Sequence, residues 1–201
     1  MEPRTLMARL ERDEHLDGLV ALGRAAAERL PRSARPALRG DWLGHPLHPL
    51  LTDLPIGFWT SAFVLDLAPT RRTDRIATLM VGLGLASALP TAAAGLADWA
   101  SLSRGRQRVG SVHAVANLVG TAMYAGSLAH RLRGRRMRGV ALALTGAAAM
   151  TVGGYLGGHL VFGTQEPGAA HEPDAAEPDG TRDASRGPST AAAAATRTFA
   201  G

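Results

Sequence analysis

The sequence predicts an all-α fold: a four-helix transmembrane bundle with an N-terminal amphipathic helix and a disordered C-terminal tail. Three observations lead to this prediction. The mean hydropathy of the 201 residues is close to zero, yet apolar residues gather in the middle of the chain and both ends are polar. The apolar part, residues 50–163, divides into four runs of helical length. Helices that are apolar on all sides are typical of lipid, and a chain of this size is too small to bury four of them in water.

Charge and cysteine content exclude several classes of protein. The net charge is +5 and every basic residue is arginine. The arginines stand at the edges of the apolar runs, as in membrane proteins, and aromatic residues are not interleaved with them, which argues against nucleic acid binding. The chain has no cysteine, so disulfides, thiolate catalysis and cysteine-ligated zinc or iron–sulfur centres are excluded. The charged first thirty residues contain no apolar core of a signal peptide.

The N-terminal region, residues 1–40, is predicted to be an amphipathic helix followed by a basic linker. Apolar residues recur at helical spacing, with charged residues on the other face. These apolar residues are Leu6, Leu10, Leu16, Leu19 and Val20. The helix, expected over residues 4–30, could lie on the membrane surface, pack on the rest of the chain or be solvated. Pro31 and Pro36 end it.

The first membrane span is expected over residues 50–68. Its uncharged centre, residues 54–65, is short for a span, which needs roughly 20 residues. The span becomes long enough if Asp53 is the helix N-cap and Asp66 is tolerated inside it. Pro55 then falls in the first turn, where its missing N–H costs nothing.

The other three spans are expected over residues 76–97, 109–130 and 139–162, each free of Asp, Glu and Arg. Pro90 is predicted to kink the second span. The four spans form a membrane domain over residues 41–163. The remaining residues, 164–201, are rich in Ala, Pro, Gly, Asp and Glu and have little to bury, which predicts disorder.

An even number of crossings places both termini on one side, together with polar residues that are distant in sequence. This side receives His45, His48, His113 and His159, with Asp53 and Asp98. The first and third loops are rich in arginine, so the positive-inside rule places these loops in the cytoplasm and the termini outside the plasma membrane.

Polar residues on two of the spans share one helix face. The third span has His113, Asn117, Gly120 and Tyr124, and the fourth has Thr151, Tyr155 and His159. Because polar groups in hydrocarbon are costly, both faces are expected to point inward and toward each other.

Several motifs resemble an uncharacterised bacterial family of predicted four-helix membrane proteins, a domain of unknown function. They are His45-Pro46-Leu47-His48-Pro49 with Asp53-Leu54-Pro55-Ile56-Gly57, Gly95-Leu96-Ala97-Asp98-Trp99, Val112-His113-Ala114 and Gly153-Gly154-Tyr155-Leu156-Gly157-Gly158-His159-Leu160. The resemblance covers residues 38–163. In some members of that family the domain precedes a Rieske iron–sulfur domain, which implies membrane-associated electron transfer. A Rieske centre needs two cysteine ligands, so in this chain a redox role would depend on the membrane domain or on a redox protein partner.

Three functions remain open from the sequence. The first is a non-enzymatic structural or partner-binding membrane subunit, including a homo-oligomer, in which the polar residues hold helices together. The alternative is a redox protein that binds haem b or a transition metal through His45, His48, His113 and His159. In that alternative Asp53, Asp98, Asn117 and Tyr155 support the ligands. The third is transport of a proton or small solute through Asp66, although Asp66 is expected to pair with Arg71 or Arg72.

Overall fold

The computed structural model describes residues 3–162, and every regular element among them is helical, which confirms the all-α prediction. The predicted disordered tail lies outside the described residues. The elements are α1 (Pro3–Arg12), the short 3-10 helix η1 (Glu14–Leu16), α2 (Asp17–Glu28), α3 (Arg35–Arg39), α4 (Leu47–Leu67), α5 (Arg71–Trp99), α6 (Arg104–Leu132) and α7 (Arg136–Phe162).

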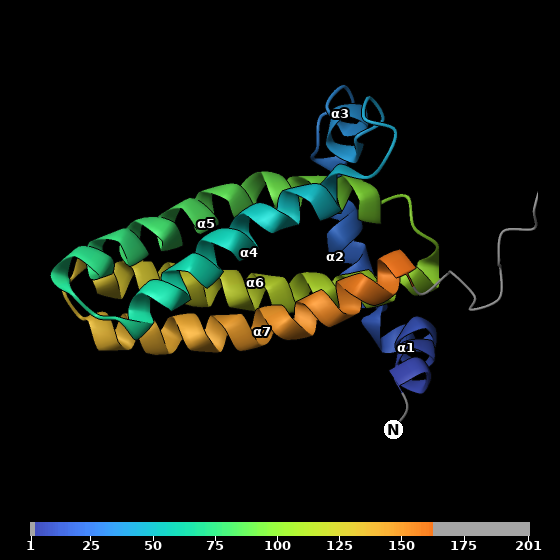
Figure 1. Ribbon diagram of the computed structural model, residues 1–201. Coiled ribbons are helices and arrows are strands. Elements are labelled where there is room, and N and C mark those ends of the chain that lie inside the picture. The colour runs from blue at the N-terminus through green and yellow to red at the C-terminus, as the bar shows by residue number, and fades with distance from the viewer. Residues whose placement is uncertain (1–2, 163–201) are drawn as a thin grey trace, which may run out of the picture. The chain divides into compact units, whose positions relative to one another are not determined.

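The four long helices form two hairpins. Helix α4 packs along α5 and α6 packs along α7, while α5 also contacts α6 (Figure 1). We call the end with the α4–α5 and α6–α7 turns the arginine end. The histidine end is the opposite one, where α4 and α6 begin and α5 and α7 finish. The helices α1, α2 and α3 lie at the histidine end.

Three of these helices, α4, α5 and α7, are long and apolar enough to cross a membrane, whereas four were predicted. Helix α6 is as long as α5, with 29 residues, but its first two turns are polar and His113 and Asn117 lower the hydropathy of the part that follows. Gln107, Val109 and Ser111 in this polar start are nonetheless buried. The covering elements are α1 and α2, both of which contact α6, so protein rather than lipid shields this part of α6.

Helix α4 begins earlier than predicted, and this changes the role of its prolines. Pro46 is the N-cap residue and Pro49 lies in the first turn, where a missing N–H is tolerated. The predicted cap, Asp53, is therefore inside the helix and exposed, and Pro55 is an interior, buried proline. An interior proline frees the carbonyl four residues before it. The Thr91 hydroxyl of α5 donates to that carbonyl, on Leu51, at 3.1 Å.

The predicted N-terminal helix is divided into shorter pieces. Asp13 interrupts it, because its side chain accepts a hydrogen bond from the His15 backbone N–H at 3.0 Å and caps η1. The resulting α1 places Met7, 2 % exposed, against Val109 of α6 and Leu156 of α7. Leu10 of the predicted apolar face packs beside Met7 and Val20 is fully buried, whereas Leu6 is 41 % exposed. Packing on the rest of the chain is one of the arrangements the sequence left open.

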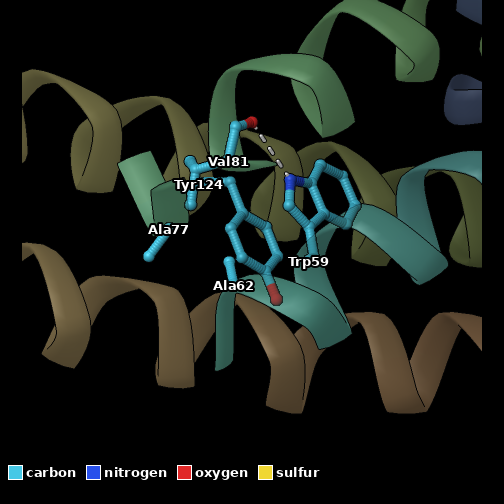
Figure 2. Close-up of a cluster of buried hydrophobic side chains, with 5 residues drawn as sticks. All are labelled: Trp59, Ala62, Ala77, Val81 and Tyr124. Carbon is cyan, nitrogen blue, oxygen red and sulfur yellow. Dashed lines mark hydrogen bonds between the residues drawn. The ribbon is translucent and has the colours of Figure 1, made fainter. Parts of the chain in front are cut away.

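An apolar layer fills the middle of the bundle (Figure 2). The Trp59 ring of α4 stacks on the Tyr124 ring of α6, with ring centroids 4.0 Å apart and planes at 4°. The indole N–H of Trp59 donates to the Val81 carbonyl of α5 at 3.4 Å. Gly84 leaves the necessary space, since a Cβ atom there would lie 2.3 Å from the indole nitrogen. This layer joins α4, α5 and α6.

Candidate functional site

A polar layer at the histidine end contains two of the four predicted histidines. We call it the histidine layer. It consists of His48 on α4, Thr91 on α5, His113 and Asn117 on α6, and Gly153 on α7. Each of the four long helices therefore contributes at least one group.

His48 bonds α4 to α5. Its Nδ1 atom lies 2.9 Å from the Thr91 carbonyl oxygen, and because a carbonyl only accepts, Nδ1 carries the hydrogen. Gly95, one turn beyond Thr91, makes room for the ring, since a Cβ atom there would lie 2.7 Å from Nδ1. The imidazole is thus held against the backbone of α5 in a fixed tautomer.

His113 bonds α6 to α7 in the same way. Its Nδ1–H donates to the Gly153 carbonyl at 2.7 Å, and its Nε2 accepts from the Asn117 side-chain amide at 2.9 Å. A Cβ atom at Gly157 would lie 2.9 Å from the ring. Both ring nitrogens are engaged by protein groups. A haem iron or metal ion could therefore bind Nε2 only after Asn117 moved away.

The two histidines also contact each other. The His48 and His113 ring centroids are 6.1 Å apart, and the rings are nearly perpendicular at 86°. This edge-to-face contact links the α4–α5 hairpin to the α6–α7 hairpin. The histidine layer consequently runs across all four helices.

The other two predicted histidines do not join this pair. His45 is exposed, and its Nδ1 lies 3.5 Å from the carbonyl oxygen of the adjacent Pro46. His159 lies beside α1, with Nε2 3.9 Å from a Glu11 carboxylate oxygen. Among residues 3–162, no three His, Asp or Glu side chains are placed to hold a metal ion. Among these residues, the four histidines that the sequence offered as ligands therefore do not form one cluster.

The four residues predicted to support the site have different surroundings. Asn117 contacts His113 as described, and the Asp98 carboxylate lies near the His48 backbone and side chain. Since Pro46 offers no side-chain cap, Asp98 supplies the negative charge that favours the start of α4. Asp53 is exposed on α4, and Tyr155 is 51 % exposed on α7. These two residues do not lie in the histidine layer.

One predicted polar face points inward and the other does not. On α6, Gly120 and Tyr124 are buried, in line with His113 and Asn117. On α7, Thr151 and Tyr155 are exposed, so the prediction for this helix is wrong. The physical reason is steric: the face of α7 that packs on α6 carries glycines that let the backbones approach. These glycines are Gly139, Gly146 and Gly153.

A second polar layer closes the arginine end, and we call it the charged layer. Arg131 of α6, whose side chain is fully buried, binds both carboxylate oxygens of Asp66 on α4. Arg136 of α7 donates to the Asp66 backbone carbonyl at 2.9 Å and lies 3.3 Å from Asp74 of α5. The predicted partners of Asp66, Arg71 and Arg72, are wrong, because the acid faces into the bundle toward α6 and α7.

Contacts that could not be predicted from the sequence hold the N-terminal helices against α6. The Trp99 indole N–H donates to the Gln107 carbonyl at 2.9 Å, and the Gln107 side chain accepts from Arg24 of α2 at 2.9 Å. Asp17 of α2 pairs with Arg108 at 2.8 Å and with Arg104 at 3.1 Å. Hydrogen bonds from these two arginines lower the pKa of Asp17 to about 2.

The comparisons with known proteins concern the same four helices. Neither a curated protein nor a solved structure matches the chain. A family model described as a predicted membrane protein (DUF2231) matches residues 44–165. The match spans more than half of the chain and includes α4, α5, α6 and α7. The length and apolar composition of α4, α5 and α7 agree with that description. The chain therefore belongs to the DUF2231 family of predicted membrane proteins.

Proposed function

We propose that this protein is a non-enzymatic structural or partner-binding subunit of the membrane, in which the histidines hold the helices together. One observation carries the proposal: His48 and His113 each donate Nδ1–H to a backbone carbonyl of a neighbouring helix, at 2.9 and 2.7 Å. A buried imidazole needs such a partner, because an unpaired polar group in an apolar setting is costly. Helix packing thus accounts for both residues without a cofactor.

The charged layer favours a structural or partner-binding function and argues against transport through Asp66. A transport site needs an acid that can exchange its ligand or proton. Asp66 is instead bound by two arginines, and its side chain is only 6 % exposed. Paired charges of this kind neutralise each other inside a bundle. Asp66 is accordingly part of the contact between α4, α6 and α7.

The proposal includes four crossings, with α6 as the fourth. Helix α5 ends at the histidine end and α7 begins at the arginine end, so α6 must run the length of the bundle. Its 29 residues span about 44 Å at 1.5 Å per residue, which exceeds the hydrocarbon thickness of roughly 30 Å. The polar start of α6 lies under α1 and α2. The arginine-rich loops at the arginine end favour a cytoplasmic position for that end of the bundle.

Absorption and metal analysis of the full chain, purified in detergent, test the proposal against the haem and metal alternative. We expect a folded, colourless protein with substoichiometric metal. His113→Ala should lower its thermal midpoint, because the Gly153 carbonyl and the Asn117 amide lose their partner. The expected cost is about 0.6–1.7 kcal/mol, from the average to the maximum measured for hydrogen bonds between membrane helices.

The control is His15→Ala, which removes an exposed imidazole outside the bundle and should leave the midpoint unchanged. A Soret band, or one equivalent of a transition metal, that disappears in His113→Ala would contradict the structural function. Equal stability of His113→Ala and His15→Ala would contradict it as well.

A further inference from the structure

The arginine end carries a large positive charge, most of which is not paired with carboxylates of the bundle. Residues 66–75 and 130–139 contain eight arginines and two aspartates. Both aspartates, Asp66 and Asp74, are engaged by Arg131 and Arg136 in the charged layer. This layer is neutral, so the full excess of six positive charges resides on the remaining arginines.

These remaining arginines are all exposed. They are Arg71, Arg72 and Arg75 at the start of α5, Arg133 and Arg135 between α6 and α7, and Arg138 at the start of α7. Within the described part of the chain, none of the six forms an ion pair with a carboxylate. Three arginines at the histidine end do have carboxylate partners, by contrast: Arg39 pairs with Asp41, and Arg104 and Arg108 share Asp17.

Exposed apolar side chains stand among the exposed arginines. Leu67 at the end of α4 is 68 % exposed, and Leu132 and Met137, on either side of the α6–α7 turn, are each 72 % exposed. A small soluble anion has no apolar part that could contact these side chains. A phospholipid can contact both kinds of side chain, because its phosphate can accept hydrogen bonds from guanidinium groups while its acyl chains contact leucine and methionine.

We infer that the arginine end is a binding site for the headgroups of anionic phospholipids. The six exposed arginines bind the headgroup phosphates, and Leu67, Leu132 and Met137 contact the adjoining acyl chains. Basic residues next to membrane helices attract anionic lipid through the negative surface potential of the leaflet. The charged layer serves this site indirectly, since it keeps the two nearby carboxylates from neutralising the arginines.

Native mass spectrometry of the full chain in a neutral detergent tests the site. The protein is titrated with dioleoyl phosphatidylglycerol and, separately, with dioleoyl phosphatidylcholine. We expect phosphatidylglycerol to bind at least tenfold more tightly. The double variant R72Q/R135Q should weaken phosphatidylglycerol binding by roughly fivefold for each arginine removed. The matched control, R29Q/R32Q, removes two exposed arginines at the other end and should change binding by less than twofold.

Three results would overturn the inference. Equal binding of both lipids would show that charge is not recognised. An equal loss in R72Q/R135Q and R29Q/R32Q would show that only net charge matters. Displacement of the lipid by inorganic phosphate at the same concentration would identify a site for soluble anions, without a contribution from the acyl chains.

Discussion

Arg131 places a guanidinium inside the arginine end with no exposed side-chain surface. Asp66 neutralises it from α4, and the Ser127 hydroxyl accepts a further hydrogen bond from Nε at 3.2 Å. A buried ion pair of this kind contributes little when compared with an apolar pair of the same size. Loss of Asp66 is costly, however, because the buried guanidinium keeps only the more distant and partly exposed Asp74 as a partner.

Asp66→Asn should therefore destabilise the protein by about 3–5 kcal/mol, measured as the free energy of unfolding in detergent. The control is Asp53→Asn on the same helix, where the carboxylate is exposed and little change is expected. The double variant D66N/R131Q should be more stable than D66N, because it no longer buries a guanidinium whose remaining carboxylate, Asp74, is 3.8 Å away and partly exposed. Equal stability of D66N and D53N would show that the pair does not hold the bundle together.

Asp17 gives the contact between α2 and α6 a pH dependence. Arg108 and Arg104 lower the pKa of Asp17 to about 2 from an ordinary 3.8. A carboxyl whose pKa is lower in the folded state stabilises that state above its unfolded pKa, and loses this effect as the pH falls through the folded pKa. Docking of α2 should thus be constant above about pH 4 and weaken between about pH 4 and pH 2.

Hydrogen exchange of the α2 amides, corrected for the intrinsic rate, measures this effect. Wild-type α2 should lose protection between pH 4 and pH 2, while Asp17→Asn should have lower protection already at pH 6 and vary less with pH. If Asp17→Asn lost protection between pH 4 and pH 2 in the same way as the wild type, a group other than Asp17 would be responsible for the pH dependence.

At the scale of residues, the sequence identified only some of the groups and none of their partners. Of the eight residues selected for a site, His48, His113, Asn117 and Asp98 lie near one another. The other four, His45, His159, Asp53 and Tyr155, lie elsewhere. The sequence could not show that the partners of both imidazoles are backbone carbonyls, because every residue has one. Likewise, Asp66 has arginines nearby in sequence, and only the packing of α4 against α6 selects Arg131.

Helix α7 shows how glycine position decides which face of an element packs. Gly153 and Gly154 are adjacent, yet a Cβ atom at Gly153 would lie 2.4 Å from the Asn117 Oδ1 atom, whereas one at Gly154 would meet nothing within 4 Å. The two glycines thus face different surroundings. Close approach of α6 to α7 depends on the first and not on the second.

Gly153→Ala should lower the free energy of unfolding in detergent by about 1–3 kcal/mol, the usual cost of overpacking a filled contact. Gly154→Ala, the matched control, should be neutral or slightly stabilising, because alanine is the better helix former. If both variants had the same stability, the close contact between α6 and α7 would not be as described.

At the scale of elements, hydropathy predicted the positions of the four long helices well and their ends less well. The predicted runs 76–97, 109–130 and 139–162 all fall within α5, α6 and α7. The helices extend beyond these runs because arginines and capping residues continue them outside the apolar part. Thr70, for example, accepts from the Thr73 N–H at 3.1 Å and starts α5 at Arg71.

The whole molecule follows a simple arrangement of layers along the bundle. The histidine layer and the charged layer each join all four long helices, and the apolar layer of Trp59 and Tyr124 lies between them. Hydropathy alone could not predict these layers, since each consists of contacts between helices. It also could not show that the N-terminal helices cover the polar start of α6.

Helix α6 is proposed to cross the bilayer, and labelling of engineered cysteines at its two ends shows whether it does. The chain has no native cysteine, so single substitutions can be placed at Ser101, before α6, and at Arg133, after it. We predict that a membrane-impermeant maleimide added to intact cells reaches only one of the two, and that the other reacts only after the cells are opened. Reaction of both from the same side would contradict the four-span bundle.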